Sequence, residues 1–311
     1  RNMDYNLGVD VTLKRFLTLR ADYYIQRTDD LLSNISLPPS TGFLTYTENL
    51  GKIENRGYEL AVSVTPWRDD ERQAYVTLSA TALHNKNKIK KIYDIFKNSN
   101  DEQNSSLDGS YDYNDGQPGD TEVLEKYLNK FTKPATLYYE GCSMTAIWGV
   151  RSLGIDPATG QEMFLTKDGR STYTWSSADQ VVIGDTSPKM SGTLNLNAGY
   201  KGFTFSASCS YKFGGDLYNS ELVARMENIN GQSNLDRRLF KAWQKVGDVA
   251  PYKVTVISSG STNYTKPTSR FVQKNNELYI SSVNVGYDFA GAAWLKKIAL
   301  ERLKVSFYMN E

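Results

Sequence analysis

The feature that most constrains this chain is a period-two alternation of apolar and polar residues, which returns in pairs of segments. Apolar side chains occupy every second position of residues 5–13, and they do so again over 17–25 after the short break at Lys14 and Arg15. Such alternation is typical of β-strands with one apolar face, and a short polar break between two of them predicts a hairpin. Further hairpins are predicted over 58–82, 194–213 and 279–309.

A weaker fifth pair, 138–153 with 161–166, flanks the turn sequence Asp156–Gly160, which brings the predicted total to about ten strands. Connections inside the pairs are short, whereas those between pairs are long: Ser33 to Glu48, Asn85 to Ala135, Lys167 to Lys189 and Gly214 to Asn276. An up-and-down transmembrane β-barrel with tight turns at one end and long loops at the other has this asymmetry. The fold class predicted is therefore all-β and antiparallel.

Composition narrows the function classes. The net charge of +1 over 311 residues argues against a nucleic-acid-binding protein, and we expect no nucleic-acid partner. The single His84 and the distant Cys142 and Cys209 match no metal or redox spacing, so neither a metal site nor a cofactor is predicted. Asp112–Gly116 resembles a calcium loop but lacks the EF-hand register. Adjacent acidic residues such as Asp29 and Asp30 are better explained as solvated charge than as a catalytic pair, and we predict no enzyme activity.

The pleat of the predicted strands assigns side chains to two faces. In a barrel with a wet interior, polar residues face the lumen or a plug, and we expect this of Asp4, Asn6, Asp10, Arg20, Asp22, Asn195 and Asn197. The alternating apolar residues then face lipid, among them Leu7, Val9, Leu19, Val62, Leu196 and Phe205.

Aromatic residues make up 12% of the chain, mostly through 21 tyrosines, as expected for barrels with aromatic girdles. Others fall in the predicted long loops, where aromatic rings could stack on sugars or hold peptides. The candidates for ligand contact are Tyr111, Tyr113, Tyr173 and Trp175. The basic cluster Lys86, Lys88, Lys90 and Lys91 lies where a strand enters a long loop. It could contact anionic lipopolysaccharide or acidic sugar, or simply be charge at the water edge.

Several longer motifs resemble the barrel of SusC/RagA-type TonB-dependent outer-membrane transporters. The most specific is Thr28–Leu32 followed by Pro38, Gly42–Phe43 and the run Asn49–Leu60. Others are Gly149 with Gly154–Gly160, Ile183–Asp185 with Pro188, Tyr200–Phe203, Gly214–Gly215 with Tyr218–Asn219, Arg237–Arg238 with Gly247–Asp248, and Tyr287 with Leu295–Lys297. The resemblance covers essentially the whole chain.

This resemblance implies a roughly 22-stranded barrel plugged by an N-terminal domain. Residues 1–311 would be a C-terminal part of that barrel, and we expect the plug, the TonB box and the final strand to lie outside this sequence. Such transporters import oligosaccharides or peptides across the Gram-negative outer membrane. They are driven by TonB and act with a SusD-like surface lipoprotein as a lid, often as a dimer of such pairs. Lipid and lipopolysaccharide would then be further partners.

Three alternatives remain at this point. A secreted β-sandwich lectin or adhesin would use the same alternation to build a core and the same tyrosines to bind carbohydrate. A carbohydrate-active enzyme would need two carboxylates facing each other across a cleft. A passive porin would share the barrel but lack a plug.

Overall fold

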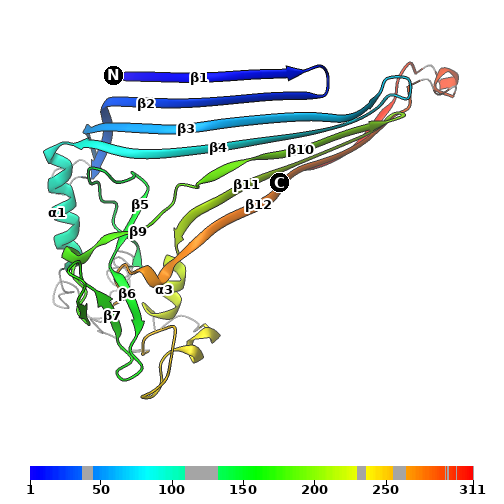
Figure 1. The fold of residues 1–311 in the computed structure, drawn as a ribbon. Helices are drawn as coiled ribbons and strands as arrows, with labels where there is room; N and C mark the ends of the chain where they lie inside the picture. The colour runs from blue at the N-terminus through cyan, green and yellow to red at the C-terminus, as the bar shows by residue number, and fades with distance from the viewer. Residues whose placement is uncertain are drawn as a thin grey trace.

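The computed structural model describes residues 1–36, 45–108, 132–229, 236–254, 264–290, 292, 294–298 and 300–310. Eight antiparallel strands form one sheet in the order β1-β2-β3-β4-β10-β11-β12-β13 (Figure 1). Their bounds are β1 Asn2–Leu13, β2 Leu17–Ser36, β3 Thr45–Asp69, β4 Ala74–Ile92, β10 Met190–Tyr200, β11 Phe203–Tyr218, β12 Val272–Asp288 and β13 Lys304–Asn310. They correspond to the four clearest hairpins predicted from the alternation.

The register keeps the two faces of this sheet chemically distinct across all eight strands. One row of cross-strand partners is entirely polar: Thr12, Thr18, Ser63, Ser79, Asn195, Ser208, Ser282 and Asn310. The next row is entirely apolar: Leu13, Leu17, Val64, Leu78, Leu196, Ala207, Val283 and Met309. Since neighbouring positions of a strand point to opposite sides, the sheet has a polar face, which carries Asn195, and an apolar face, which carries Leu196.

No second layer covers the apolar face in the part of the chain that the structure describes. Leu7 is 72% exposed and Phe307 67%, and Leu13, Leu78 and Met309 are also exposed. A contiguous apolar surface of this size is unusual for a protein that meets only water. This arrangement disagrees with the β-sandwich alternative, which requires the same side chains to be packed against another sheet.

Tight turns join β1–β2, β3–β4 and β10–β11 at one end of the sheet, as predicted, and the connections β4–β10 and β11–β12 at the other end are long. The β12–β13 connection departs from the prediction, because residues 289–303 lie at the tight-turn end and include η6 (Leu295–Ile298), and it is longer than the eight-residue connection 37–44 between β2 and β3 at the opposite end. Lys14, Gln73 and Lys201 have φ angles of 50°, 50° and 46° within the short turns, and Gly202 follows Lys201 at 89°. Such left-handed residues let antiparallel strands reverse within a few positions. Figure 1 shows these short turns at the end of the sheet away from α1 (Asp94–Asp108) and α3 (Ser220–Met226).

At the opposite end, the connections β4–β10 and β11–β12 fold together into what we call the outer body. It contains the helices α1 (Asp94–Asp108) and α3 (Ser220–Met226), the pair β5 (Ala146–Gly149) and β9 (Val181–Asp185), and the three-stranded sheet of β6 (Arg151–Ile155), β7 (Glu162–Leu165) and β8 (Ser171–Thr172). Short 3-10 helices η3 (Ser177–Asp179), η4 (Arg237–Lys241) and η5 (Ser269–Phe271) complete it, and η6 (Leu295–Ile298) lies in the β12–β13 connection.

The fifth predicted strand pair belongs to the outer body rather than to the main sheet. Segments 151–155 and 162–165 do pair across the predicted turn, but they do so in the small β6-β7-β8 sheet. The main sheet therefore has eight strands in this chain instead of about ten. The physical reason is length, because strands of four or five residues cannot cross a bilayer that needs about 9 to 11.

Buried apolar clusters lie only in and under the outer body among the described residues. Ile147, Tyr218, Val223 and Phe271 form one cluster inside the body. Ile53, Ile89, Ile92 and Phe96 form another, in which α1 covers the polar-face side of β3 and β4 near their outer ends. The rest of the sheet has no such core.

The antiparallel all-β fold class is confirmed, and the sheet is not closed in this chain, since β1 and β13 lie at its two edges. Among the described residues, no helix has the length and apolar character needed to span a membrane.

Candidate functional site

A cavity of about 360 Å³ opens in the outer body between the β6–β7 hairpin and segments that come from both long connections. It is lined by aromatic, amide, hydroxyl and charged side chains: Gln161, Glu162, Phe164, Tyr173, Thr174, Trp175, Lys253, Tyr264, Thr265 and Lys266, with Gly160 and Val254. Such a mixture can stack on flat apolar surfaces and form several hydrogen bonds at once.

The hairpin that forms one wall of this cavity is fixed by its turn sequence. The Asp156 carboxylate accepts hydrogen bonds from the Ala158 N–H at 3.0 Å and from the Thr159 hydroxyl at 2.9 Å. Gly160 has a φ of 70°, and its α-carbon lies so close to the Trp243 ring that a β-carbon would approach a ring atom to 2.5 Å. The Trp243 indole N–H also donates to the Pro157 carbonyl at 2.9 Å. The turn is thereby held against Trp243, which follows η4 in the chain.

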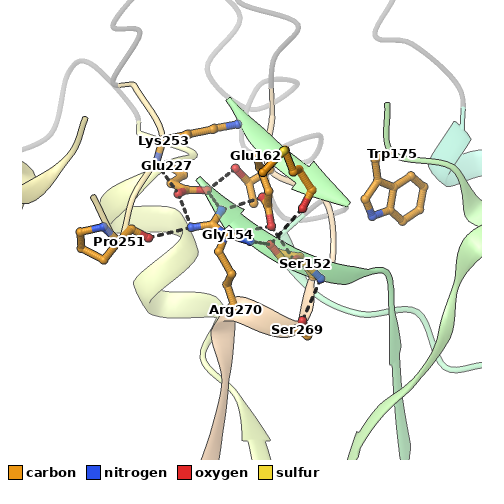
Figure 2. A network of polar contacts seen from close by, with 12 residues as sticks. Ser152, Gly154, Glu162, Trp175, Glu227, Pro251, Lys253, Ser269 and Arg270 are labelled. Atoms are coloured by element: carbon orange, nitrogen blue, oxygen red, sulfur yellow. Dashed lines mark hydrogen bonds and ion pairs between the residues drawn. The ribbon is translucent and has the colours of Figure 1, made fainter. Parts of the chain in front are cut away.

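Below the cavity, Arg270 holds together three separate segments of the outer body (Figure 2). It donates to Glu162 at 2.8 and 2.6 Å, to Glu227 at 2.8 Å twice, and to the Pro251 carbonyl at 2.9 Å. These five hydrogen bonds use all five N–H groups of the guanidinium. The side chains of Arg270, Glu162 and Glu227 are only 12%, 5% and 0% exposed, so they form a buried charge network.

Charge outweighs burial in the Glu227–Arg270 pair and shifts both pKa values in directions that keep the pair ionised, whereas burial dominates at Lys253. Burial alone would raise the pKa of Glu227, but attraction and hydrogen bonds from Arg270 outweigh it, and this pKa lies below its ordinary value. Burial would likewise lower the pKa of Arg270, whereas the two carboxylates raise it. Lys253 lies 8% exposed beside Glu227, and its burial lowers the pKa of its ammonium group. The two carboxylates thus share the Arg270 guanidinium as their ion-pair partner.

Two of the predicted ligand contacts, Tyr173 and Trp175, lie together on the cavity wall. Tyr173 is 48% exposed, and its hydroxyl donates to Asp156 at 2.8 Å, which raises the pKa of this tyrosine. The Trp175 N–H donates to the Pro267 carbonyl at 3.0 Å, and the Lys266 ammonium lies 5.0 Å from the centre of its ring. Both rings are therefore held in place with part of their surface toward the cavity. Tyr111 and Tyr113 lie outside the described residues.

The seven residues predicted to face the lumen all lie on the polar face of the sheet. Asp10 pairs with Arg20 across β1 and β2, and the Arg20 Nε atom lies 2.7 Å from the Asp10 carboxylate. Asp4, Asn6 and Asp22 share this face through the same register. Asn195 and Asn197 lie opposite Ser79 and Thr77 of β4. The assignment of this face to a lumen stays a prediction.

Sequence reasoning missed Glu162, Glu227, Lys253 and Arg270. Arg270 is 108 residues from Glu162 and 43 from Glu227, so no local spacing connects them. Among the described residues, no group of three or more His, Cys, Asp or Glu side chains is placed to hold a metal ion. The calcium-like run Asp112–Gly116 lies outside those residues.

Comparison with known proteins connects this architecture to one family. A family model for the TonB-dependent receptor-like β-barrel matches residues 1–229. TonB-dependent receptor P39 of Formosa agariphila is 25% identical over 98% of this chain, which spans 31% of that receptor. TonB-dependent receptor SusC of Bacteroides thetaiotaomicron is 36% identical over 64 residues, 20% of this chain and 6% of SusC.

Among solved structures, the RagAB peptide transporter has the same fold. It aligns with all of this chain at a TM-score of 0.68 and 17% identity, and the chain covers 32% of that transporter chain. The chain therefore spans about a third of the length of these larger relatives.

Proposed function

Because this chain belongs to the TonB-dependent receptor β-barrel family, we propose that it forms part of the wall and the outer loops of a nutrient importer. The predicted resemblance to SusC/RagA-type transporters and the Gram-negative outer-membrane location are confirmed by the family and the relatives. The relatives are about three times as long as this chain. Import, its cargo and its partner proteins are therefore proposed here for the whole protein.

The observation that carries the proposal is a sheet with two chemically distinct faces whose long connections fold into one outer body. An uncovered apolar face suits lipid, while a polar face with Asn195, Asn197 and the Asp10–Arg20 pair suits a water-filled or plugged interior. The outer body and its cavity would then lie outside the cell, where arriving solute would meet the protein first.

The cargo that this cavity fits best is an oligosaccharide or a peptide. Tyr173 and Trp175 offer ring surfaces, and Gln161, Thr174 and Thr265 offer amide and hydroxyl groups. One solved structure with the same fold is a peptide transporter. A SusD-like lipoprotein would close over the outer body, TonB would drive release inward, and two such pairs would form the dimer. No bond in the cargo is broken, and the protein acts as a transporter and not as an enzyme.

Uptake by cells that make the intact transporter tests this proposal. We expect labelled oligosaccharides or peptides to accumulate in cells with the wild-type protein. We expect little accumulation in cells without it, or with a version that lacks its TonB-binding segment. Uptake that continues without TonB coupling would favour the passive porin instead.

A matched pair of variants connects the uptake to the cavity. Trp175→Ala removes the ring surface on the cavity wall, and we expect it to weaken cargo binding by the intact protein, since stacking on one aromatic ring is worth about 0.5–1.5 kcal/mol. Phe240→Ala is the control, because this ring is 80% exposed in η4 and does not line the cavity. Equal losses in both variants would contradict the role of the cavity.

A further inference from the structure

The apolar face of the sheet changes character where strands β2, β3 and β4 approach the outer body. A row of aromatic residues, Tyr23, Tyr58 and His84, forms the last ring-rich level on that face, and the Tyr58 and His84 rings stack with centroids 5.0 Å apart. The positions beyond this row on the same face are mostly charged. Aromatic rows of this kind mark the boundary between hydrocarbon and headgroups in membrane barrels.

The charged group beyond this row is centred on Glu54, which is 3% exposed. The Nε atoms of Arg27 and Arg56 lie 2.8 and 2.7 Å from its carboxylate oxygens, and the Lys90 ammonium lies at 3.0 Å. These three cations remain about half exposed, with side-chain exposures of 52%, 49% and 43%. One buried carboxylate thus holds three cations in a fixed arrangement, and their outer surfaces face away from the protein.

Two further lysines extend this group. Lys86 lies opposite Arg56, and Lys88 lies opposite Glu54 in the register of β3 and β4. Both are exposed, and neither has an ion-pair partner among the residues that the structure describes. We call Arg27, Arg56, Lys86, Lys88 and Lys90 the basic strip. Its five cations are balanced locally by one carboxylate, so the strip carries an excess of positive charge. Lys91, predicted to be part of the cluster, lies one row further out opposite Lys52.

The basic strip faces the outside of the sheet, not the outer body. Ile53 and Ile89, neighbours of Glu54 and Lys88 along their strands, point to the opposite face and are packed with Phe96 of α1. The cargo cavity is built from other segments altogether. Charge on this outward face would be solvated at the water edge or matched by an anion in the membrane surface.

We infer that the basic strip binds the phosphate groups of lipopolysaccharide in the outer leaflet. Its height, one or two rows beyond the aromatic level, is where the headgroup of an outer-leaflet lipid begins. Lys and Arg are the side chains that bind phosphate most strongly, and preset cations lose less conformational freedom on binding. The inference requires the outer-membrane location of the chain but not the import of any particular cargo.

Lipid binding by the intact transporter tests the strip directly. The probes are purified lipopolysaccharide, the same lipopolysaccharide after removal of its phosphates, and inorganic phosphate, each measured by native mass spectrometry after extraction in detergent. We expect tight binding of the first alone, and weakening at high salt. Equal binding of the dephosphorylated lipid would overturn the inference, and equal occupancy by inorganic phosphate would show a plain anion site and overturn it as well.

Variants then assign the binding to the strip. Lys86→Gln/Lys88→Gln removes the two lysines that have no role in holding Glu54, and we expect lipopolysaccharide affinity to fall about tenfold or more. Lys241→Gln/Lys245→Gln removes two exposed lysines of the outer body and serves as the matched control, with affinity unchanged. Equal affinity in the strip variant and the wild type would contradict the assignment. The salt and dephosphorylation measurements on the wild-type protein decide the inference even if a variant fails to assemble.

Discussion

The main sheet and the outer body differ in where they place apolar and charged side chains. In the sheet, large apolar side chains such as Leu7 and Phe307 remain exposed, and the ion pair Asp10–Arg20 has both partners about two-thirds exposed. In the outer body, Val223 and Phe271 are buried together with the charges of Arg270, Glu162 and Glu227. This difference is what we expect if the two regions fold in different surroundings, the sheet against lipid and the outer body against water.

The largest effect expected from this comparison is loss of the buried cation in the outer body. Arg270→Met leaves Glu162 and Glu227 buried without their partner, which costs about 3–5 kcal/mol. Arg170→Met is the control, since its pair with Asp168 is more than 70% exposed on both sides and contributes at most about 1 kcal/mol. Limited proteolysis of the outer body in the intact protein measures both, and similar cleavage rates would contradict the buried network.

A charge on the apolar face should have the next largest effect. Leu196→Arg places a cation toward the middle of the proposed lipid face and is expected to cost about 2–4 kcal/mol, whereas Asn195→Arg points to the polar face and should be tolerated far better. The yield of heat-resistant, assembled protein in the outer membrane is the measurement. Equal yields for the two variants would contradict the assignment of the faces.

Substitutions of two glycines in the outer body separate the cost of a left-handed backbone from the cost of a steric contact. Gly160→Ala must adopt a φ of 70° and also meets the Trp243 ring, while Gly169→Ala adopts a φ of 81° with no neighbouring atom within 4 Å. The left-handed conformation costs about 1–2 kcal/mol in both. The thermal unfolding temperature of the outer body should therefore fall further for Gly160→Ala than for Gly169→Ala. If both variants unfolded at the same temperature, the result would contradict the packing of the turn against Trp243.

The smallest effect expected is the loss of stability of the wild-type outer body in acid. The pKa of Glu227 lies below its ordinary value, so its contribution to stability is complete above about pH 4.3 and is lost as the pH falls through the folded-state pKa. Glu227→Gln has no carboxylate that can take up a proton in acid, and it should flatten the acid limb of the stability curve. The curve is measured by proteolysis at successive pH values, and an unchanged acid limb in the variant would refute the linkage.

The alternation of residues predicted the sheet well because its register follows from a local pattern. The hairpins over 5–25 and 194–213 needed no information beyond their own sequence. Residues 33–36 and 45–48 are mostly polar and do not alternate clearly, so the sequence placed Ser33 to Glu48 in a loop although β2 reaches Ser36 and β3 begins at Thr45. The Arg270 network joins residues from three distant segments, and pairing of that kind leaves no periodic trace.

The central claim is that the apolar face of the sheet contacts lipid while the polar face does not. Spin labels at position 196 or 195, in the intact protein with Cys142 and Cys209 replaced by serine and reconstituted into bilayers, test it most directly. The account predicts that the label at 196 collides frequently with dissolved oxygen, which concentrates in hydrocarbon, and rarely with a water-soluble nickel complex. It predicts no such preference at 195. The same oxygen accessibility at both positions would contradict the claim.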